Sequence, residues 1–314
     1  MYLSNNEIEV EILLATYQGE KHVQELLESL LNQTHPNIRI LIRDDGSQDQ
    51  TRKILKKFEN AYPDKISVIF DNKNLGVIGN FSELLKNSRA KYVLFSDQDD
   101  YWLPNKVELS ISQLKVMEKK HGADSPLLLH TNLQVVDKDL QMIDPSFWNY
   151  VRLNPSFTQP NRLLLQNCIT GCTMAMNRAL ANLSYPIPKN VLMHDWWIAL
   201  LASCFGKIEH IQESTLLYRQ HSSNTLGAKR PDLFVTIKNF FYKKNHGYHT
   251  RNQGLTLLKF FEKELDDKIR ETIQVFCGMK NISFLQQRKQ ILKYRFFKHS
   301  KFHNFVRFFL PFRY

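Results

Sequence analysis

The sequence lacks any run of about 18 uninterrupted apolar residues, the length that a membrane-spanning helix requires. The segment Met1–Glu11 holds three acids and no apolar run, so we expect neither a secretory signal nor a transit peptide. Cysteine is scarce, and its spacing does not match that of a structural zinc site: Cys168, Cys172, Cys204 and Cys277. We therefore expect a globular, cytoplasmic chain with reduced thiols that does not cross a bilayer.

Acidic residues are missing from the end of the chain, because none follows Glu271. Residues 230–314 hold 18 of the 42 Lys and Arg but only 6 of the 31 Asp and Glu, so this region accounts for the net charge of +11. Such asymmetry predicts an acidic partner, either an anionic membrane surface or nucleic acid. We expect no nucleic-acid partner, since no binding module is recognisable and the charge lies at one end.

Five phenylalanines recur at helical spacing near the C-terminus, with basic residues interleaved: Phe302, Phe305, Phe308, Phe309 and Phe312, with Lys298, Lys301, Arg307 and Arg313. Basic residues opposite an aromatic stripe are typical of a helix that lies in an anionic membrane interface. The alternative is a helix that packs its Phe face on the core. The pattern predicts membrane contact for residues 288–314.

Short β-rich runs alternate with helical patterns over the first hundred residues. The predicted strands are Val10–Ala15, Ile38–Ile42, Ile66–Phe70 and Tyr92–Phe95. This alternation predicts an α/β fold, a Rossmann-like nucleotide-binding core with a mainly parallel sheet. Beyond Lys229 the pattern becomes helical and basic. We therefore predict a core domain over residues 1–228 and a helical C-terminal region over 229–314.

Polar residues follow each predicted strand, at the end of an open parallel sheet where ligands bind. The segments are Thr16-Tyr17-Gln18-Gly19-Glu20, Arg43-Asp44-Asp45-Gly46-Ser47, Asp71-Asn72-Lys73-Asn74 and Ser96-Asp97-Gln98-Asp99-Asp100. Alternate carboxylates at the end of a strand suit a hard divalent cation. An acidic turn and an Asp-Gly turn are the alternatives. The Pro-containing segment Asp144–Pro160 is long for a connection and is a candidate substrate loop.

These motifs, in their order, resemble the family 2 glycosyltransferases of GT-A fold. The resemblance is carried by Ala15–Glu20, Arg43–Ser47, Asn74-Leu75-Gly76 and Asp97–Trp102. Within that family, Met193-His194-Asp195-Trp196-Trp197-Ile198-Ala199-Leu200 and Leu217-Tyr218-Arg219-Gln220-His221 look like bacterial rhamnosyltransferases of cell-wall and capsular polysaccharides. The resemblance covers roughly residues 8–228, which would form the catalytic domain.

The resemblance implies a nucleotide-sugar donor and a divalent metal, Mg²⁺ or Mn²⁺. It implies that Asp45, helped by Asp44 and the turn at Thr16 and Tyr17, reads the nucleobase and ribose. Further residues assigned to the donor side are Glu20, Asn74, Asp97 and Arg219. Asp97 and Asp99 match the metal-binding Asp-X-Asp motif, Asp99 being preferred as the direct ligand, and His221 matches a histidine that completes the site.

Asp195 matches the general base of the family. An inverting displacement needs one carboxylate to take the proton of the acceptor hydroxyl while the metal stabilises the leaving diphosphate. A helix cap is the alternative role for Asp195. Trp196 and Trp197 beside it are expected to offer an aromatic platform to the acceptor sugar, with core packing as the alternative. Many relatives carry an acid where this chain has His194.

The resemblance to rhamnosyltransferases implies transfer of L-rhamnose from dTDP-L-rhamnose to a lipid-linked glycan. A UDP-hexose donor is the alternative, and an inactive scaffold is a further one. Neither the Gln-X-X-Arg-Trp motif nor the membrane helices of processive members occur, so we expect single or limited sugar addition. The enzyme is expected to be peripheral on the inner face of the plasma membrane; the sequence leaves the oligomeric state open.

Overall fold

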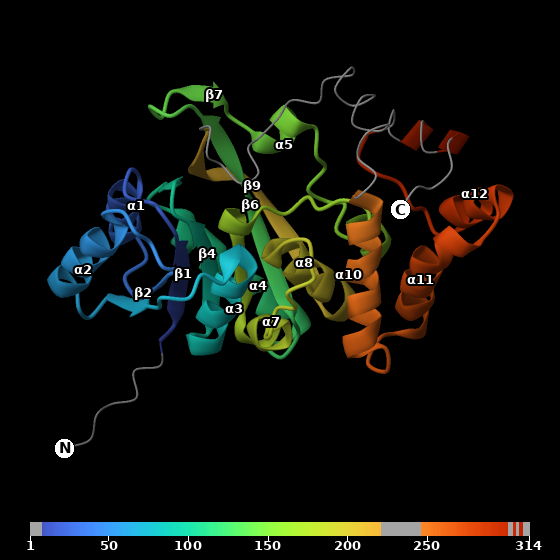
Figure 1. Cartoon of the computed structure of the whole chain (residues 1–314), viewed down its shortest axis with the longest axis horizontal. Helices are drawn as coiled ribbons and strands as arrows, with labels where there is room; N and C mark the ends of the chain where they lie inside the picture. The colour runs from blue at the N-terminus through green and yellow to red at the C-terminus, as the bar shows by residue number, and fades with distance from the viewer. Residues whose placement is uncertain (1–7, 221–245, 301–303, 306–307, 310–314) are drawn as a thin grey trace.

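The computed structural model describes residues 8–220, 246–300, 304–305 and 308–309. Within them, nine strands form one sheet in the order β3-β2-β1-β4-β8-β6-β9-β5, and β7 pairs with β6 (Figure 1). The strands are β1 Val10–Thr16, β2 Ile38–Asp44, β3 Ile66–Phe70, β4 Tyr92–Asp97, β5 Tyr101–Trp102, β6 Leu127–Val136, β7 Met142–Asp144, β8 Met174–Asn177 and β9 Lys207–Arg219.

The sheet confirms the α/β prediction and limits its parallel part to the N-terminal half. β1 pairs in parallel with β2 and β4, and β2 with β3. Beyond β4 the sheet is mixed, because β8 runs antiparallel to both β4 and β6, whereas β6 and β9 are parallel. The four strands predicted in the first hundred residues are confirmed as β1 to β4.

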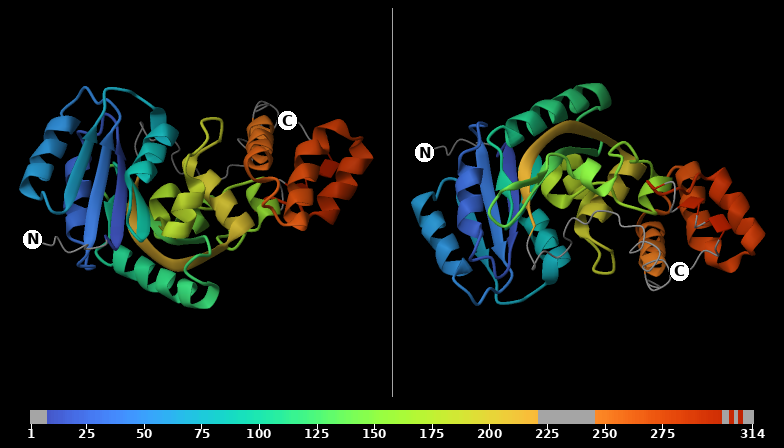
Figure 2. Two further views of the ribbon diagram at one scale, coloured as in Figure 1. Left: turned by 90° about the horizontal axis from the view of Figure 1, so that it is seen from below. Right: turned by 90° about the horizontal axis from the view of Figure 1, so that it is seen from above.

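Helices cover both faces of the sheet (Figure 2). In β1, Ile12 and Leu14 belong to one buried cluster and Leu13 to the other, as expected when successive side chains point to opposite faces. The first cluster packs against α1 Val23–Leu31, α2 Thr51–Ala61 and α4 Lys106–His121. The second packs against α3 Gly76–Asn87, α7 Arg178–Ser184 and α8 His194–Phe205.

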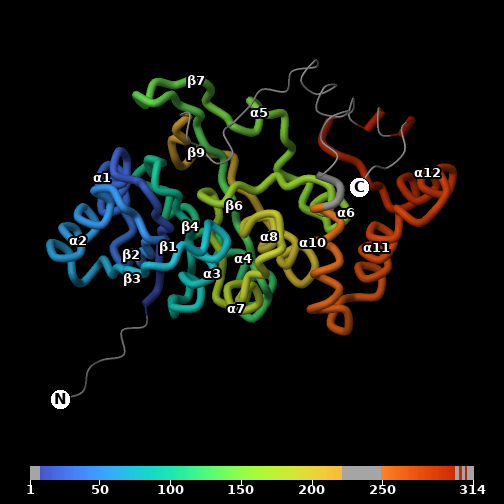
Figure 3. Tube along the Cα trace, viewed as in Figure 1, coloured from blue at the N-terminus to red at the C-terminus, as the bar shows by residue number. Residues whose placement is uncertain are grey.

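The C-terminal helices lie at the end of the molecule opposite α2 (Figures 1 and 3). They are α10 His246–Phe261, α11 Asp267–Gly278 and α12 Phe284–Lys293. Leu257 of α10 and Phe276 of α11 belong to the same buried cluster as α8, so these helices extend the core. The predicted division at residue 228 falls outside the described residues and stays a prediction.

Two short helices, α5 Phe147–Val151 and α6 Pro160–Leu163, lie in or next to the candidate substrate loop. The turn from α8 to β9 requires a glycine, because a Cβ at Gly206 would come 1.7 Å from the carbonyl oxygen of Pro126. Among the helices described, none is long and apolar enough to span a membrane. The four cysteines are buried free thiols.

Candidate active site

The predicted ligand edge of the sheet consists of the ends of β1, β2 and β4. The strand register places Thr16 beside Asp44 and Ala15 beside Asp97. Because parallel strands end at the same edge, the polar segments that follow them meet in space although they are distant in sequence. The structure thus brings together Thr16, Asp44 and Asp97 as the sequence predicts.

Gln98 ties the loop after β1 to the loop after β4. Its side-chain oxygen accepts a hydrogen bond from the Tyr17 N–H at 2.8 Å, and its side-chain nitrogen donates to the Tyr17 carbonyl at 2.9 Å. A Cβ at Gly19 would come 2.4 Å from the Gln98 oxygen, so this contact needs a glycine there. The Tyr17 side chain itself is 47% exposed and available to a ligand.

Asp44 and Asp45 are buried, and both carboxylates have protein partners. Asp44 accepts hydrogen bonds from the hydroxyls of Thr16 and Ser47. Asp45 accepts from the backbone N–H groups at the start of α3 and pairs with Arg43 at 2.6 Å. These carboxylates therefore organise the loops of the site, a role that differs from the direct contact with base and ribose expected from the sequence.

Glu20 and Asn74 are exposed residues of the segments that follow β1 and β3. Glu20 accepts a hydrogen bond from the backbone N–H of Gln50, which precedes α2, at 2.9 Å. The Asn74 side chain accepts one from the N–H of Gly76 at 3.1 Å. Each side chain holds a turn next to a helix, and its predicted contact with the donor stays a prediction.

Acidic groups gather after β4. One oxygen of Asp97, one of Asp100 and the sulfur of Cys172 lie within 4.8 Å of one another. Asp100 is 1% exposed, and within the described residues no N–H or O–H group donates to its carboxylate; beside it lies only the weak thiol donor of Cys172. A buried carboxylate without a strong donor is costly unless a cation or a proton neutralises it.

The electrostatics of this cluster favour a cation. Burial raises the pKa of Asp97, and the nearby carboxylates of Asp99 and Asp195 raise it further. Burial also raises the pKa of Asp100, again with Asp99 and Asp97 contributing. The two carboxylates suit a hard divalent ion, whereas the Cys172 thiol, whose pKa burial also raises, is a soft group that such ions do not prefer. The donor set therefore fits Mg²⁺ or Mn²⁺ through its oxygens.

Asp195 lies in the first turn of α8. One carboxylate oxygen accepts a hydrogen bond from the Gly171 N–H at 3.1 Å, and the other accepts from the N–H of Trp196. Burial raises the pKa of Asp195 to about 7. Because the charge of Asp195 also raises the pKa of Asp97, the two carboxylates are close enough to interact. A carboxylate with this pKa beside a cation site has the properties of a general base.

His194, which precedes Asp195 at the start of α8, is buried in an apolar environment. Its ring stacks on Phe81 with the centroids 4.0 Å apart, and burial lowers its pKa to about 3, so the ring is neutral. A Cβ at Gly171 would come 2.9 Å from the His194 ring nitrogen. The glycine thus lets its own N–H approach Asp195, and the neutral His194 ring adds no charge next to that carboxylate.

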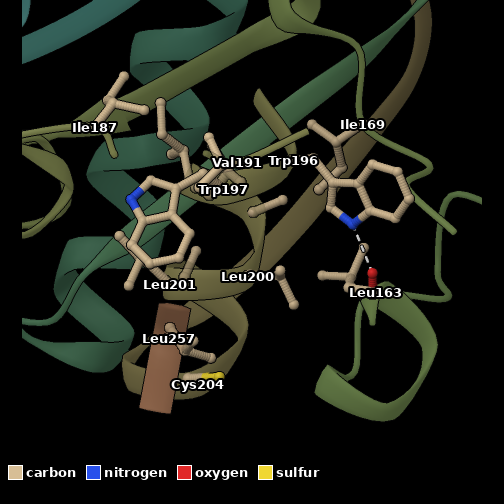
Figure 4. Close-up of a cluster of buried hydrophobic side chains, with 14 of the residues drawn as sticks. Leu163, Ile169, Ile187, Val191, Trp196, Trp197, Leu200, Leu201, Cys204 and Leu257 are labelled. Atoms are coloured by element: carbon tan, nitrogen blue, oxygen red, sulfur yellow. Dashed lines mark hydrogen bonds between the residues drawn. The ribbon is translucent and has the colours of Figure 1, made fainter. Parts of the chain in front are cut away.

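Trp196 and Trp197 do not form an acceptor platform. The two residues are 8% and 1% exposed and belong to the core cluster (Figure 4). The indole N–H of Trp196 donates to the Leu163 carbonyl at 2.5 Å, and the ring of Trp197 packs against Phe260 and Phe261. The sequence expectation is corrected here: both rings are enclosed because α8 is covered by α6 and α10.

Arg219 is engaged in several contacts within the protein. Only 4% of it is exposed, and its guanidinium forms an ion pair with Glu25. The same group donates to the carbonyl oxygens of Asp99 at 3.1 Å and of Lys138 at 2.7 Å. Arg219 therefore fixes the backbone of the carboxylate loop, and its predicted contact with the diphosphate stays a prediction. His221 lies outside the described residues, so its place in the metal site stays a prediction.

Sequence reasoning gave Gln98 and Asp100 only a place in the motif, and Cys172 only a place among the reduced thiols. Gln98 stands between two aspartates in the motif, and an acidic motif by itself indicates a role only for its carboxylates. Cys172 is distant from the motif in sequence and enters the site because β8 pairs with β4. For Gln98 and Asp100, the only signal in the sequence was the run of four polar residues, 97–100, at the end of a buried strand.

Comparison with known proteins agrees with this geometry. The family model described as Glycosyl transferase family 2 matches residues 11–182. The dTDP-rhamnosyl transferase RfbG of Shigella flexneri is 28% identical over 265 residues, covering 80% of this chain and 82% of RfbG. The UDP-Glc:alpha-D-GlcNAc-diphosphoundecaprenol beta-1,3-glucosyltransferase WfgD of Escherichia coli is 27% identical over 200 residues, covering 61% of this chain and 69% of WfgD.

Solved structures share the fold. S. aureus TarS 1–349, in complex with UDP, matches with a TM-score of 0.57 at 17% identity and covers 90% of this chain and 78% of its own. The mannosyltransferase PcManGT from Pyrobaculum calidifontis, in complex with GDP-Man and Mn²⁺, matches with a TM-score of 0.58 at 12% identity, covering 93% and 74%. At these identities the likeness concerns the fold alone.

Proposed function

The chain belongs to glycosyl transferase family 2, and we propose that it transfers L-rhamnose from dTDP-L-rhamnose to a hydroxyl of a lipid-linked bacterial polysaccharide precursor, with inversion and with a divalent metal. The observation that carries the proposal is the position of Asp195. Its carboxylate, with a pKa near 7, lies within electrostatic reach of the acidic cluster after β4. A base and a cation site next to each other are what a single displacement at a sugar carbon requires.

The residues divide the work as follows. Asp195 takes the proton of the acceptor hydroxyl, and the Gly171 N–H orients its carboxylate. The carboxylates after β4, Asp97 and Asp99 together with Asp100, hold the metal, and His221 joins them as the resemblance implies. When bound, a divalent cation neutralises the charge that develops on the leaving diphosphate.

The nucleotide lies at the ends of β1 and β2. The exposed Tyr17 ring is the group we assign to contact with the base. Asp44 and Asp45 hold the surrounding loops in place by accepting hydrogen bonds from Ser47 and from the Gly76 N–H. Arg219 acts through Asp99, whose carbonyl it holds, and is thus a positioning residue.

The similarity to the dTDP-rhamnosyl transferase RfbG supports dTDP-rhamnose as the donor. The similarity to the glucosyltransferase WfgD favours a UDP-hexose as the alternative and supports a polyprenyl-diphosphate-linked acceptor. Because such acceptors are membrane-bound, we propose that the basic region 229–314 keeps the enzyme at the inner face of the plasma membrane. We propose a single or limited sugar addition, in line with the absent processivity motif.

The release of nucleoside diphosphate tests the proposal. Purified enzyme is incubated with dTDP-rhamnose, UDP-glucose or UDP-galactose, with Mg²⁺, Mn²⁺ or EDTA, with and without a lipid-linked glycan mimic. We expect release from dTDP-rhamnose that requires the metal, increases with the mimic and disappears in Asp195→Asn. Faster release from a UDP-hexose would replace the rhamnosyl assignment, and release that EDTA leaves unchanged would reject the metal.

A further inference from the structure

Helix α12 exposes apolar side chains on one side. Leu285 is 72% exposed and Leu292 is 56% exposed, and Lys289 lies between them. Residues four and three apart share a helix face, so these three side chains form one stripe. The opposite side of the helix, with Gln287 and Ile291, is buried against the neighbouring helices. Two large aliphatic side chains at this exposure on one short helix mark an interaction surface.

Aromatic side chains continue this surface. Phe284 is 43% exposed, Phe305 63% and Phe309 62%. Arg288 joins the two parts: its guanidinium lies over the Phe284 ring at 4.2 Å and donates to the Phe308 carbonyl at 2.6 Å. Phe305 and Phe309 contact each other with centroids 4.8 Å apart. We call the set Phe284, Leu285, Leu292, Phe305 and Phe309 the terminal face.

The charge around the terminal face has one sign. Between residues 272 and 300 every charged side chain is basic: Lys280, Arg288, Lys289, Lys293, Arg295 and Lys298. The last acid, Glu271, is already paired with Lys293. An apolar patch inside a basic rim complements a bilayer with anionic headgroups, because the apolar groups enter the acyl boundary while the lysines meet phosphates.

We propose that the terminal face docks on an anionic lipid bilayer, inserting Leu285, Leu292 and its aromatic rings. The proposal rests on the proposed function only in that a lipid-linked acceptor requires an enzyme at the membrane. It extends the sequence expectation of membrane contact for residues 288–314, since α12 supplies three of the inserted residues and two of them, Phe284 and Leu285, precede residue 288.

The segment 294–299, which follows α12, is hydrogen-bonded to α6 and to the candidate substrate loop. Asn161 donates to the Tyr294 carbonyl at 2.9 Å, and Arg162 donates to the Phe297 carbonyl at 2.7 Å. The ring of His299 accepts from the Asn154 N–H at 2.9 Å. The carbonyl of Leu163, the next residue after Arg162, accepts from Trp196 beside the base. Docking of α12 therefore brings the 154–163 segment close to the bilayer. The hydrogen bond between Leu163 and Trp196 connects this segment to the start of α8, which carries Asp195.

Binding of the full chain to vesicles tests the proposal. The variant Leu285→Ser/Leu292→Ser removes inserted groups, and Val116→Ser, at a 53% exposed site on α4, is the matched control. We expect the wild type and the control to sediment with phosphatidylglycerol vesicles and less with phosphatidylcholine ones, and the double variant to bind at least about tenfold more weakly. Lys289→Glu should weaken binding by about tenfold and Lys119→Glu, on α4, should not.

Further readouts separate this proposal from the proposed function. Metal-dependent donor release in vesicle-free solution should be equal in the wild type and the double variant, which also shows that the variant is folded. Hydrogen exchange in 154–163 should slow when wild type binds vesicles and not when Lys289→Glu is mixed with them. Unchanged vesicle binding by the double variant, or tighter binding of the wild type to RNA at equal salt, would overturn the docking surface whatever the donor assay gives.

Discussion

The half-buried carboxylate of Asp195 leads to a prediction in which catalysis and stability change in opposite directions. Replacing it by Asn removes the ionised group and keeps the shape. General bases contribute about a hundredfold to ten-thousandfold, so Asp195→Asn should lose that much of the transfer rate. Donor binding should be retained, because the cation site after β4 keeps its carboxylates.

The effect on stability depends on pH. The pKa of Asp195 rises from 3.8 to about 7 on folding, so the folded state binds the proton more tightly and stability falls as pH rises between these values. At about 1.4 kcal/mol per pKa unit, the ionised group costs up to about 4 kcal/mol at pH 8. Because the side chain is partly exposed, we expect about half of that.

The Asn variant avoids this cost but loses one of the two hydrogen bonds that Asp195 accepts, worth about 1 kcal/mol. At pH 8 it should therefore be more stable than the wild type by about 1 kcal/mol. At pH 5 that advantage should vanish or reverse, since the wild-type carboxyl is then mostly protonated.

Urea titrations of both proteins at pH 5 and pH 8, beside nucleotide binding and transfer assays, measure these differences. Asp64→Asn, at an exposed position after α2, is the control and should behave as wild type at both pH values. A stability difference that is the same at pH 5 and pH 8 would refute the buried, ionisable base. Loss of donor affinity in Asp195→Asn would point to a structural role instead.

Other predictions address the corrected and predicted residues. Asp99→Ala should weaken Mn²⁺-dependent nucleotide binding; equal affinity across a Mn²⁺ titration would remove it from the ligand set. Arg219→Lys should raise the Mn²⁺ needed for half-maximal activity about tenfold, because the single nitrogen of lysine cannot reach all three acceptors that the separate guanidinium nitrogens of Arg219 contact; a lower Tm with an unchanged metal requirement would make its role only structural. Trp197→Ala should cost about 3–5 kcal/mol in urea unfolding, whereas a raised acceptor KM at full stability would restore the platform. Between pH 5 and 7 transfer should rise about tenfold per unit and then level, since only ionised Asp195 accepts a proton; a flat profile would assign the base to another group.

The sequence predicted the parallel half of the sheet well because β1 to β4 are short, mainly apolar runs, each followed by polar residues and, for β1 to β3, then by a helix. It could not give the mixed half, since the pairing of β8 between β4 and β6 depends on contacts that no local pattern encodes. The motif residues Thr16, Asp44 and Asp97 met at one edge as predicted because parallel strands must end together.

The site assignments that changed were those that depended on tertiary partners. Arg219 forms an ion pair with Glu25, a residue of α1 that is distant in sequence, and no residue near Arg219 in the sequence predicts that pairing. The burial of both tryptophans did have a signal. From Trp196 to Ala202 every residue of α8 is apolar, and a helix that is apolar all round is enclosed by the protein. The two adjacent tryptophans point in different directions and are both covered for that reason.

The core around α8 also decides how the C-terminal region can be tested. Ile291 and Phe296 belong to the buried cluster that holds α8, and so does Leu257 of α10. A deletion of residues 288–314 would remove the first two, leave apolar surface exposed and destabilise the helix that carries Asp195. Loss of vesicle binding after such a deletion would then mix unfolding with loss of the docking surface. Substitutions at Leu285 and Leu292 avoid this, because their side chains face water and the core under α12 stays filled. If the terminal face acts only in membrane binding, these variants should keep the wild-type Tm and lose their binding to vesicles.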